Sequence, residues 1–296
     1  MLAIEKVAKR FGDKVVLDDL SFAVRPGELF GFCGANGSGK TTTMRIILGL
    51  LRADAGRVTW NGAPIDADVR QAIGYMPEER GLYPKMRPAE QLAYFAQLHG
   101  VDPARAKRSA AYWIERLGVK LEPKDTLEKL SLGNQQKVQM AAALVHDPAI
   151  LVLDEPFSGL DPVAVDSLLD ALTEKANAGV PVIFSSHQLE LVERLCDAVG
   201  IISDGHMVAF GPVHSLRAQE ARKQLVVSVA GVLPGWSRAL PHVSESQEKG
   251  STAIVTVTEP ERSNEVLAAA MALGPVEQFA WKSPTLTEIF REVVAA

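Results

Sequence analysis

Cysteine is scarce in this chain of 296 residues, which holds only two. Two cysteines, Cys33 and Cys196, cannot build a disulfide framework in a chain of this length, so a disulfide-stapled secreted scaffold is excluded. Cys33 stands in an apolar stretch, where a thiol usually serves as a small buried hydrophobe. We therefore expect reduced cysteines and a cytosolic chain.

Long apolar runs are also missing. No stretch approaches the ~18–20 apolar residues that are needed to cross a bilayer, and the first residues contain no apolar segment typical of a signal peptide. We therefore expect a soluble chain whose membrane role depends on partner proteins.

An excess of positive charge is absent, because the formal net charge is −5. Proteins that bind nucleic acid normally present a basic face, so we expect no nucleic-acid partner. A local basic patch within an acidic total is the alternative. The six histidines show no ligand spacing with each other or with the cysteines, so we expect no structural metal site.

The patterns that are present predict an α/β fold. Residues 2–24 form two predicted strands joined by a Gly-Asp turn, and the apolar runs "AILVLD" and "VPVIFSS" have the length and composition of buried parallel strands. Helical periodicity fills residues 41–51, 88–100 and 104–118, and strands that alternate with helices favour a parallel core sheet.

The last part of the chain has a different character. A Gly-Pro break and a short polar helix at residues 211–223 precede apolar strands and two helices. We predict a small α+β accessory domain over residues 222–296. It contains no recognisable chemical motif, and a packing or dimer-clamping module is the plain interpretation.

The stretch "GANGSGKT", Gly34 to Thr41, matches the phosphate-loop pattern G-x-x-x-x-G-K-[ST]. It follows a predicted strand and opens a predicted helix, as the motif requires. Glycines let backbone N–H groups face a phosphate chain, Lys40 offsets the charge of the β- and γ-phosphates, and the Thr41 hydroxyl reaches Mg²⁺. The alternative is a glycine-rich turn without a ligand.

Two acids, Asp154 and Glu155, end the apolar strand "ILVLD". The carboxyl end of a parallel strand lies beside the phosphate loop, so we expect Asp154 to hold Mg²⁺ and Glu155 to be the general base for the attacking water. A solvated acidic turn is the competing interpretation.

These motifs occur in a fixed order with "LSLGNQ" (Leu130–Gln135), "SGLD" (Ser158–Asp161) and "SSH" ending at His187. The order resembles the ATP-binding subunit of ATP-binding cassette (ABC) transporters over about residues 1–217. The resemblance implies an ATP-binding α/β core, an antiparallel β subdomain and a helical subdomain at about residues 80–135. It also implies that ATP and Mg²⁺ are bound.

The resemblance further implies residue roles. Lys40, Glu155 and His187 are the catalytic candidates, with His187 contacting the γ-phosphate. Thr41, Glu78 and Asp154 are the candidate Mg²⁺ ligands. The candidate nucleotide contacts are Phe11, Gly34, Asn36, Gly37, Ser38, Gly39, Lys40, Thr41, Thr42, Ser131, Gly133, Gln135 and Asp161.

Several of these residues act through a second chain in the family. The signature "LSLGNQ" of one copy closes over ATP held by the other, with Ser131 and the amides near Gly133 on the γ-phosphate, and Asp161 lies in a loop that passes contacts across the dimer. Phe11 matches an aromatic that stacks on adenine, with a core aromatic as the alternative. Without the other motifs, His187 would be interpreted as a structural histidine at a strand end. Ser131 would likewise be interpreted as the cap of an ordinary helix.

The sequence departs from the family pattern at three positions. Leu132 and Asn134 replace glycines that are common in the signature, and Glu78 occupies the position of a usual glutamine. A carboxylate still offers an oxygen to a metal but loses the amide donor. The wording "PEERGLYPKM" and the C-terminal "VEQFAWKSPTLTEIF" resemble bacterial exporters of the sodium-efflux and antibiotic-resistance type.

We therefore predict the ATP-hydrolysing motor subunit of an ABC exporter. It is expected to work as an ATP-dependent dimer on separate integral membrane permease subunits, at the cytoplasmic face of the inner (plasma) membrane. The alternative is a soluble ABC ATPase that acts on ribosomes or DNA. A phosphate-loop kinase is more distant, because it has no use for "LSLGNQ" or His187.

Overall fold

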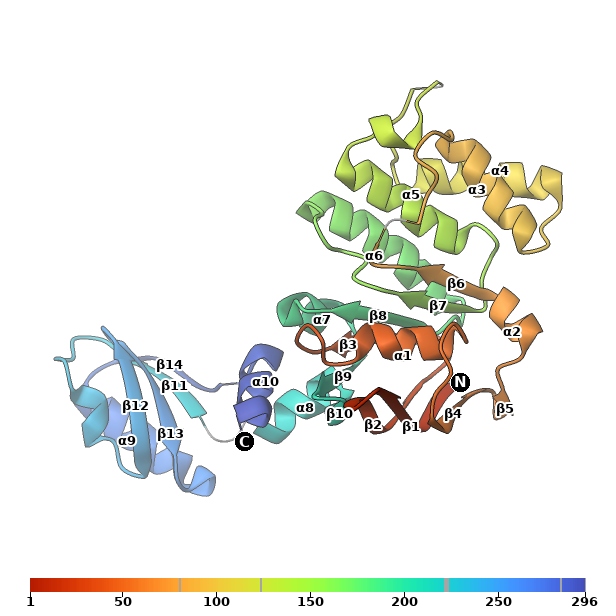
Figure 1. Cartoon of the computed structure of the whole chain (residues 1–296). Coiled ribbons are helices and arrows are strands. Elements are labelled where there is room, and N and C mark those ends of the chain that lie inside the picture. The colour runs from red at the N-terminus through yellow and green to blue at the C-terminus, as the bar shows by residue number, and fades with distance from the viewer. Residues whose placement is uncertain (80, 123, 221–223, 283, 296) are drawn as a thin grey trace. The chain divides into compact units, whose positions relative to one another are not determined.

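The computed structural model describes residues 1–79, 81–122, 124–220, 224–282 and 284–295. The chain divides into two compact units, residues 1–211 and 212–296 (Figure 1). Three predicted boundaries, at residues 80, 222 and 296, lie outside the described residues. The helix expected after the Gly-Pro break belongs to the second unit.

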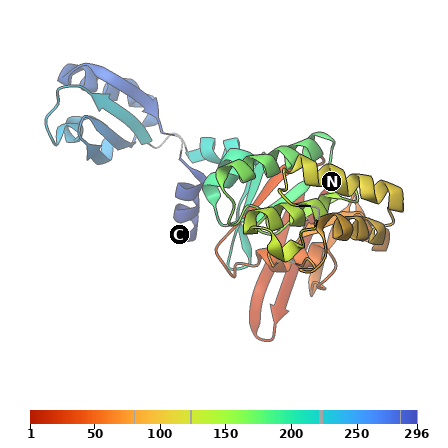
Figure 2. The same cartoon turned by 90° about the horizontal axis from the view of Figure 1, so that it is seen from above.

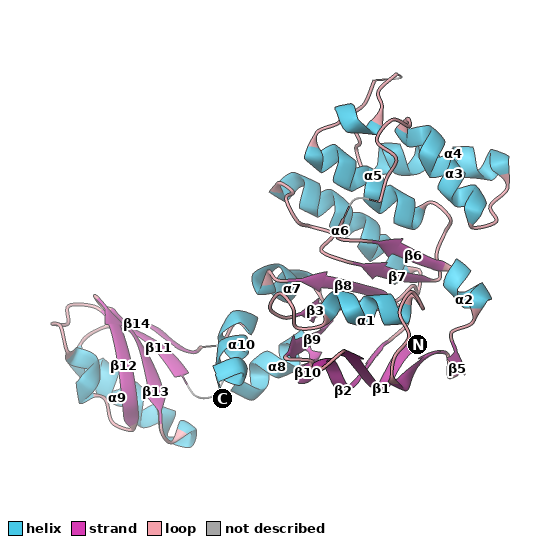
Figure 3. Cartoon of the chain, in the orientation of Figure 1, coloured by secondary structure: helices cyan, strands magenta, loops and turns pink. Residues whose placement is uncertain are grey.

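A six-stranded sheet forms the centre of the first unit, in the order β10-β9-β3-β8-β7-β6 (Figure 3). Its strands are β3 (Leu29–Cys33), β6 (Ile73–Met76), β7 (Ile150–Leu153), β8 (Val182–Ser186), β9 (Ala198–Ser203) and β10 (His206–Pro212). The pairs β3–β8, β3–β9, β7–β8 and β6–β7 are parallel. Every residue of β3, β7 and β8 is buried, as the apolar runs predict.

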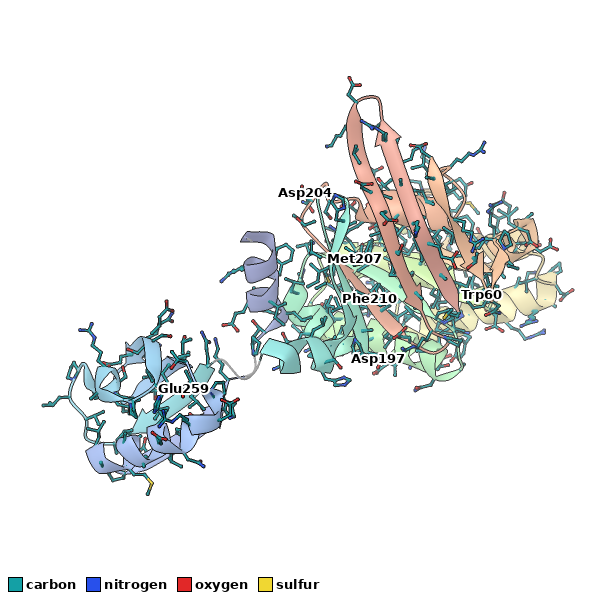
Figure 4. The ribbon with its side chains drawn as sticks, turned by 90° about the horizontal axis from the view of Figure 1, so that it is seen from below. Trp60, Asp197, Asp204, Met207, Phe210 and Glu259 are labelled. Atoms are coloured by element: carbon teal, nitrogen blue, oxygen red, sulfur yellow. The ribbon has the colours of Figure 1, made fainter. Side chains whose placement is uncertain are left out.

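A second sheet, ordered β2-β1-β4-β5, forms the antiparallel subdomain. Its strands are β1 (Leu2–Phe11), β2 (Lys14–Val24), β4 (Ala55–Trp60) and β5 (Ala63–Pro64). Phe22 of β2 stacks on Phe30 and Phe32 of β3, with ring centroids 5.3 and 5.2 Å apart. Trp60 of β4 and Met207 of β10 pack against the same apolar cluster (Figure 4). The two sheets therefore share one core.

The helices of the core lie against these sheets. They are α1 (Lys40–Ile47), α2 (Ala67–Gln71), α6 (Pro162–Asn177) and α7 (Leu189–Leu195). Met44 and Ile47 of α1 join the cluster shared by the two sheets, so α1 lies between them. The predicted extent of this helix, to residue 51, was wrong: Gly49 has φ +71° and its N–H bonds to the Ile46 carbonyl, which ends the helix.

Three helices and a 3-10 turn form the helical subdomain (Figure 2). They are α3 (Pro88–Leu98), α4 (Pro103–Arg116), η1 (Leu127–Lys129) and α5 (Leu132–Leu144). All three helices pack on one another, and Leu92, Trp113 and Val138 are buried among them. A parallel core sheet, an antiparallel subdomain and a helical subdomain confirm the predicted α/β fold class.

The second unit is built on a four-stranded antiparallel sheet, ordered β12-β13-β11-β14. Its elements are α8 (Val213–Glu220), β11 (Gln224–Val229), η2 (Trp236–Ala239), β12 (Val243–Lys249), β13 (Thr252–Val257), η3 (Pro260–Arg262), α9 (Ser263–Leu273), β14 (Val276–Trp281) and α10 (Leu286–Ala295). Leu225, Val255, Trp236 and Val266 meet in its core.

Candidate functional site

The phosphate loop connects β3 to α1, and its glycines are required by left-handed backbone angles or by close contacts. Gly37 and Gly39 have φ angles of +82° and +111°. A Cβ on Gly39 would lie 2.6 Å from the Leu17 side chain, and one on Gly34 would lie 2.3 Å from the Ile202 carbonyl oxygen. The loop is therefore held tightly between β2 and β9, with the N-terminus of α1 at its end.

Lys40 is buried at this end of the loop, with 7% of its surface exposed. Its ammonium donates to the carbonyl oxygens of Gly34 (2.7 Å) and Ala35 (3.1 Å). The Ser38 hydroxyl is also buried, and no described group accepts or donates a hydrogen bond to it. An ammonium and an unpaired hydroxyl at a helix N-terminus suit an anionic ligand.

The two acids after β7 are fixed by Ser185 of β8. The Ser185 hydroxyl donates to Asp154 Oδ1 (2.5 Å) and accepts the Glu155 N–H (2.8 Å). Asp154 is only 1% exposed, yet its Oδ2 has no hydrogen-bond partner in the described part of the chain. A buried, unpaired carboxylate oxygen is a fitting ligand for a divalent cation. Sequence reasoning missed Ser185, although it lies in the quoted "SSH".

Glu155 and His187 are brought together. His187 Nδ1 lies 3.0 Å from Glu155 Oε2, and the two side chains are 52% and 11% exposed. Glu155 also has φ +49°, an uncommon value for a side chain of this size. The turn after β7 therefore holds the Glu155 carboxylate against His187 at the mouth of the site.

Lys40 and the two acids line one cleft of about 330 Å³, whereas Gly34, Ser38 and His187 are not among its lining residues. It is lined by Val16, Asn36, Gly37, Gly39, Lys40, Thr41, Thr42, Glu78, Asp154 and Glu155. All of them except Val16 are residues that the sequence singled out. Val16 carries no chemical signature and borders the cleft because β2 packs against the phosphate loop.

Other predicted site residues do not line the cleft. Phe11 ends β1 and is 51% exposed. Ser131 is the N-cap of α5, and its hydroxyl accepts hydrogen bonds from the backbone and side-chain nitrogens of Asn134 (3.4 and 3.2 Å). The Gln135 side chain donates to the Leu130 carbonyl (2.9 Å). Within one chain, the signature contributes nothing to the cleft.

The signature instead lies beside the loop that carries Asp161. A Cβ on Gly133 would be 3.7 Å from the Leu160 side chain. Asp161 is the N-cap of α6 and accepts the Ala164 N–H (2.8 Å). Leu132, next to Gly133, is 64% exposed, and Val163, two residues after Asp161, is 79% exposed. Two predicted cross-dimer motifs thus share a surface with exposed apolar side chains.

A separate apolar groove of about 250 Å³ lies where β6 meets the helical subdomain. We call it the β6–α3 groove; its lining includes Ile73, Tyr75, Phe95, Leu98, His99 and His146. Beside it, Tyr83 stacks on Phe95 with ring centroids 5.9 Å apart, and Tyr83 and Tyr94 are both about half exposed. The part of the segment 78–87 that the structure describes lies at this groove through Gly81 and Leu82.

Comparison with known proteins identifies the family. Residues 17–158 match the ABC transporter family, and residues 211–294 match the C-terminal domain of DrrA1-3-like ATP-binding proteins. The uncharacterized ABC transporter ATP-binding protein YhaQ of Bacillus subtilis is 38% identical over 296 residues, covering 100% of this chain and 99% of its own length. The chain belongs to the ABC transporter ATP-binding proteins. The predicted resemblance is confirmed.

Other relatives of this ABC ATP-binding protein have named roles. The linearmycin resistance ATP-binding protein LnrL of Bacillus subtilis is 34% identical over 276 residues, which are 91% of this chain and 86% of LnrL. The Nod factor export ATP-binding protein I of Burkholderia orbicola is 32% identical over 289 residues, 96% of this chain and 93% of the relative.

Solved structures agree with this assignment. The ATP-binding subunit of an ABC transporter superposes with a TM-score of 0.69 at 30% identity, covering 74% of this chain and 93% of that subunit. The dimeric cassette MJ0796 has the same fold at 21% identity, with a TM-score of 0.66. This ABC protein is thus an ATP-binding, ATP-hydrolysing transporter subunit, and the ribosome, DNA and kinase alternatives are set aside. Among the described residues, no helix is both long and apolar enough to cross a membrane.

Proposed function

We propose that two copies of this chain bind two MgATP molecules between them and drive export through separate membrane permeases. The observation that carries the proposal is the division of the predicted site over two surfaces. The cleft holds the phosphate loop and the two acids, whereas the signature and Asp161 lie elsewhere on the same chain. A second copy supplies the missing half, and the exposed Leu132 and Val163 suit a surface that becomes covered.

Within each cleft, backbone N–H groups of the phosphate loop and Lys40 bind the phosphates. Thr41, Asp154 and Glu78 would supply oxygens to Mg²⁺, whose charge offsets that of the phosphates when it is bound. The unpaired Oδ2 of Asp154 and the position of Glu78 on the cleft support this assignment. Glu78 offers a charged oxygen where the family usually has a neutral amide.

Glu155 is proposed as the general base. Its carboxylate is only 11% exposed and lies 3.0 Å from His187, so it can accept a proton from water in the cleft while His187 holds its orientation. His187 then contacts the γ-phosphate. Ser185 keeps both acids in place and does not itself line the cleft.

The permease partner is proposed to dock at the β6–α3 groove. The groove is apolar, lies on the helical subdomain, and is flanked by the half-exposed Tyr83 and Tyr94. Aromatic side chains around an apolar depression are typical of protein interfaces. Docking there places this ATPase at the cytoplasmic face of the inner membrane as a peripheral subunit.

Export rather than import is proposed from two relatives that align over most of the chain. One is named for linearmycin resistance and the other for Nod factor export. The cargo of this transporter is not assigned, because specificity belongs to the permease.

The decisive experiment uses Glu155→Gln. This change removes the general base but keeps the side-chain shape, so ATP binding is retained and the closed dimer cannot be released by hydrolysis. We expect a dimer at saturating MgATP and a monomer with MgADP, measured by analytical ultracentrifugation, with ATP turnover lowered at least about a hundredfold.

Glu190→Gln on the exposed start of α7 is the matched control, since it removes the same charge outside the cleft. It should retain turnover and show no trapped dimer. Glu155→Gln protein that binds ATP but stays monomeric would refute the proposal.

A further inference from the structure

Phe11 lies at the tip of the ribbon formed by β1 and β2, which extends away from the helices (Figure 2). The register pairs Phe11 with Lys14 and Lys9 with Leu17. Val16, which lies between Lys14 and Leu17 on β2, lines the phosphate cleft. The aromatic ring is therefore connected to the cleft by a short stretch of β2, although the ring itself does not line the cleft.

One face of this ring is already occupied. The Lys9 ammonium lies 5.4 Å from the centroid of the Phe11 ring, within the range of a cation–π contact. Even so, 51% of Phe11 remains exposed, whereas the Lys9 side chain is only 12% exposed. The cation is thus packed against the hairpin while the rest of the ring stays open to solvent.

Asp54 holds this cation from the segment that enters β4. Its Oδ1 accepts from Lys9 Nζ (2.7 Å), and its Oδ2 accepts from the Arg10 N–H (2.7 Å). The Asp54 N–H in turn donates to the Ala8 carbonyl (2.9 Å). The hydrogen bond from Lys9, followed by that from Arg10, lowers the pKa of Asp54 below its ordinary value. The carboxylate therefore stays charged, and its bond to the Arg10 backbone fixes the oxygen that accepts from Lys9.

We infer that Lys9 and Asp54 are positioning residues for the adenine base: Asp54 fixes Lys9, Lys9 caps one face of Phe11, and the opposite face receives the base. The inference rests on the proposed binding of ATP and on the stacking of adenine on Phe11 that the family resemblance implies. A ring with one face packed against the Lys9 ammonium has fewer orientations open to it, so less ordering is needed when the base binds. The cost of a flexible ring would otherwise appear as weaker ATP binding.

A different role for Lys9 must be separated from this one. An ammonium near a triphosphate attracts it directly, whatever the base. Inorganic tripolyphosphate has the charge of the nucleotide tail but no ring to stack. Lys9 acting through Phe11 changes affinity for ATP alone, whereas Lys9 acting as a free charge changes affinity for both.

The test measures ATP turnover by the full chain and, by calorimetry, its binding of a non-hydrolysable ATP analogue and of magnesium tripolyphosphate. For Lys9→Met we expect the KM for ATP and the Kd for the analogue to rise about two- to fivefold, with less than a twofold change in kcat and in tripolyphosphate affinity. Asp54→Asn should change them in the same direction. Arg57→Met is the control, because it breaks the ion pair with Glu5 on the same sheet, away from Phe11.

Phe11→Ala separates this inference from the stacking role on which it rests; the proposed function is tested apart from both by Glu155→Gln. It should raise the KM for ATP about tenfold, and adding Lys9→Met to it should have no further effect. An unchanged KM in Phe11→Ala refutes the stacking role and Lys9 positioning with it. Two outcomes overturn the positioning role alone. In the first, Phe11→Ala raises the KM and Lys9→Met leaves it unchanged. In the second, Lys9→Met still raises the KM when Phe11 is already alanine.

Discussion

His146 is a partly buried histidine that stacks on His99, with the ring centroids 3.8 Å apart. Burial, and secondly the neighbouring His99, lower its pKa from 6.5 to about 4. In the unfolded chain His146 takes up a proton below about pH 6.5, whereas in the folded chain it stays neutral down to about pH 4. The free energy of unfolding therefore falls as the pH drops through this window.

We predict that this single residue contributes about 3 kcal/mol to the loss of stability between pH 6.5 and pH 4. His146→Phe keeps a ring on His99 and cannot titrate, so its unfolding free energy should vary less over this range, as measured by urea denaturation at several pH values. His206→Asn, at an exposed position, is the control. An equally steep pH dependence in His146→Phe and in the unmodified chain would show that His146 is not responsible.

Residue roles could be predicted from the sequence only where a motif names them. Lys40, Asp154 and Glu155 belong to patterns with a chemical reason, and the structure places them on one cleft. Ser185 and Val16 have no such pattern. Their contributions arise because β8 and β2 lie beside the site, and that neighbourhood is set by sheet order rather than by local sequence.

At the scale of elements, α5 begins at the signature, where Ser131 has both a structural role and a proposed binding role. As the N-cap it accepts the Asn134 N–H, which stabilises the helix start by about 1 kcal/mol. In the proposed dimer it also faces the γ-phosphate of the other copy. Aspartate caps helices as well as serine but repels a phosphate, so one substitution separates the two roles.

We predict that Ser131→Asp keeps the midpoint of thermal unfolding within about 2 °C and abolishes ATP-dependent dimerisation when it is combined with Glu155→Gln. Ser131→Ala should instead lower the midpoint and weaken the dimer. Calorimetry and ultracentrifugation provide the two measurements. Persistence of the dimer in Ser131→Asp would place the signature away from the nucleotide.

Elements were predictable where their side chains are uniformly buried. The apolar runs identify β7 and β8, because a strand covered on both faces needs apolar residues at every position. The strand β12 was missed: its sequence, "VSESQEK", is polar, and it forms only by pairing with β13 at the edge of a sheet. Its strand character comes from tertiary hydrogen bonds that local propensity does not report.

At the scale of the whole molecule, the chain consists of two units with separate cores. We predict that a chain ending at Pro212 folds and binds MgATP with a Kd within about threefold of the full chain, because the cleft draws every lining residue from the first unit. Circular dichroism and calorimetry test this. An insoluble or nucleotide-free fragment would show that the second unit is needed to complete the first.

The sequence changes near residues 211–223 from alternating strands and helices to a Gly-Pro break and a short polar helix. The division between the two compact units falls after residue 211. The Gly-Pro pair is the physical reason for that signal, since Pro212 ends the edge strand β10 and has no N–H for a further ladder bond. The role of the second unit could not be predicted, because its core residues are a scaffold without chemical groups in a recognisable arrangement.

The separation of Lys40 from Ser131 on one chain has a genetic consequence under the proposed arrangement. In a cell with two alleles, one damaged in the phosphate loop and the other in the signature, a mixed pair combines both lesions in one pocket and leaves the second pocket whole. Such alleles can complement each other, whereas two copies of either allele leave no pocket intact.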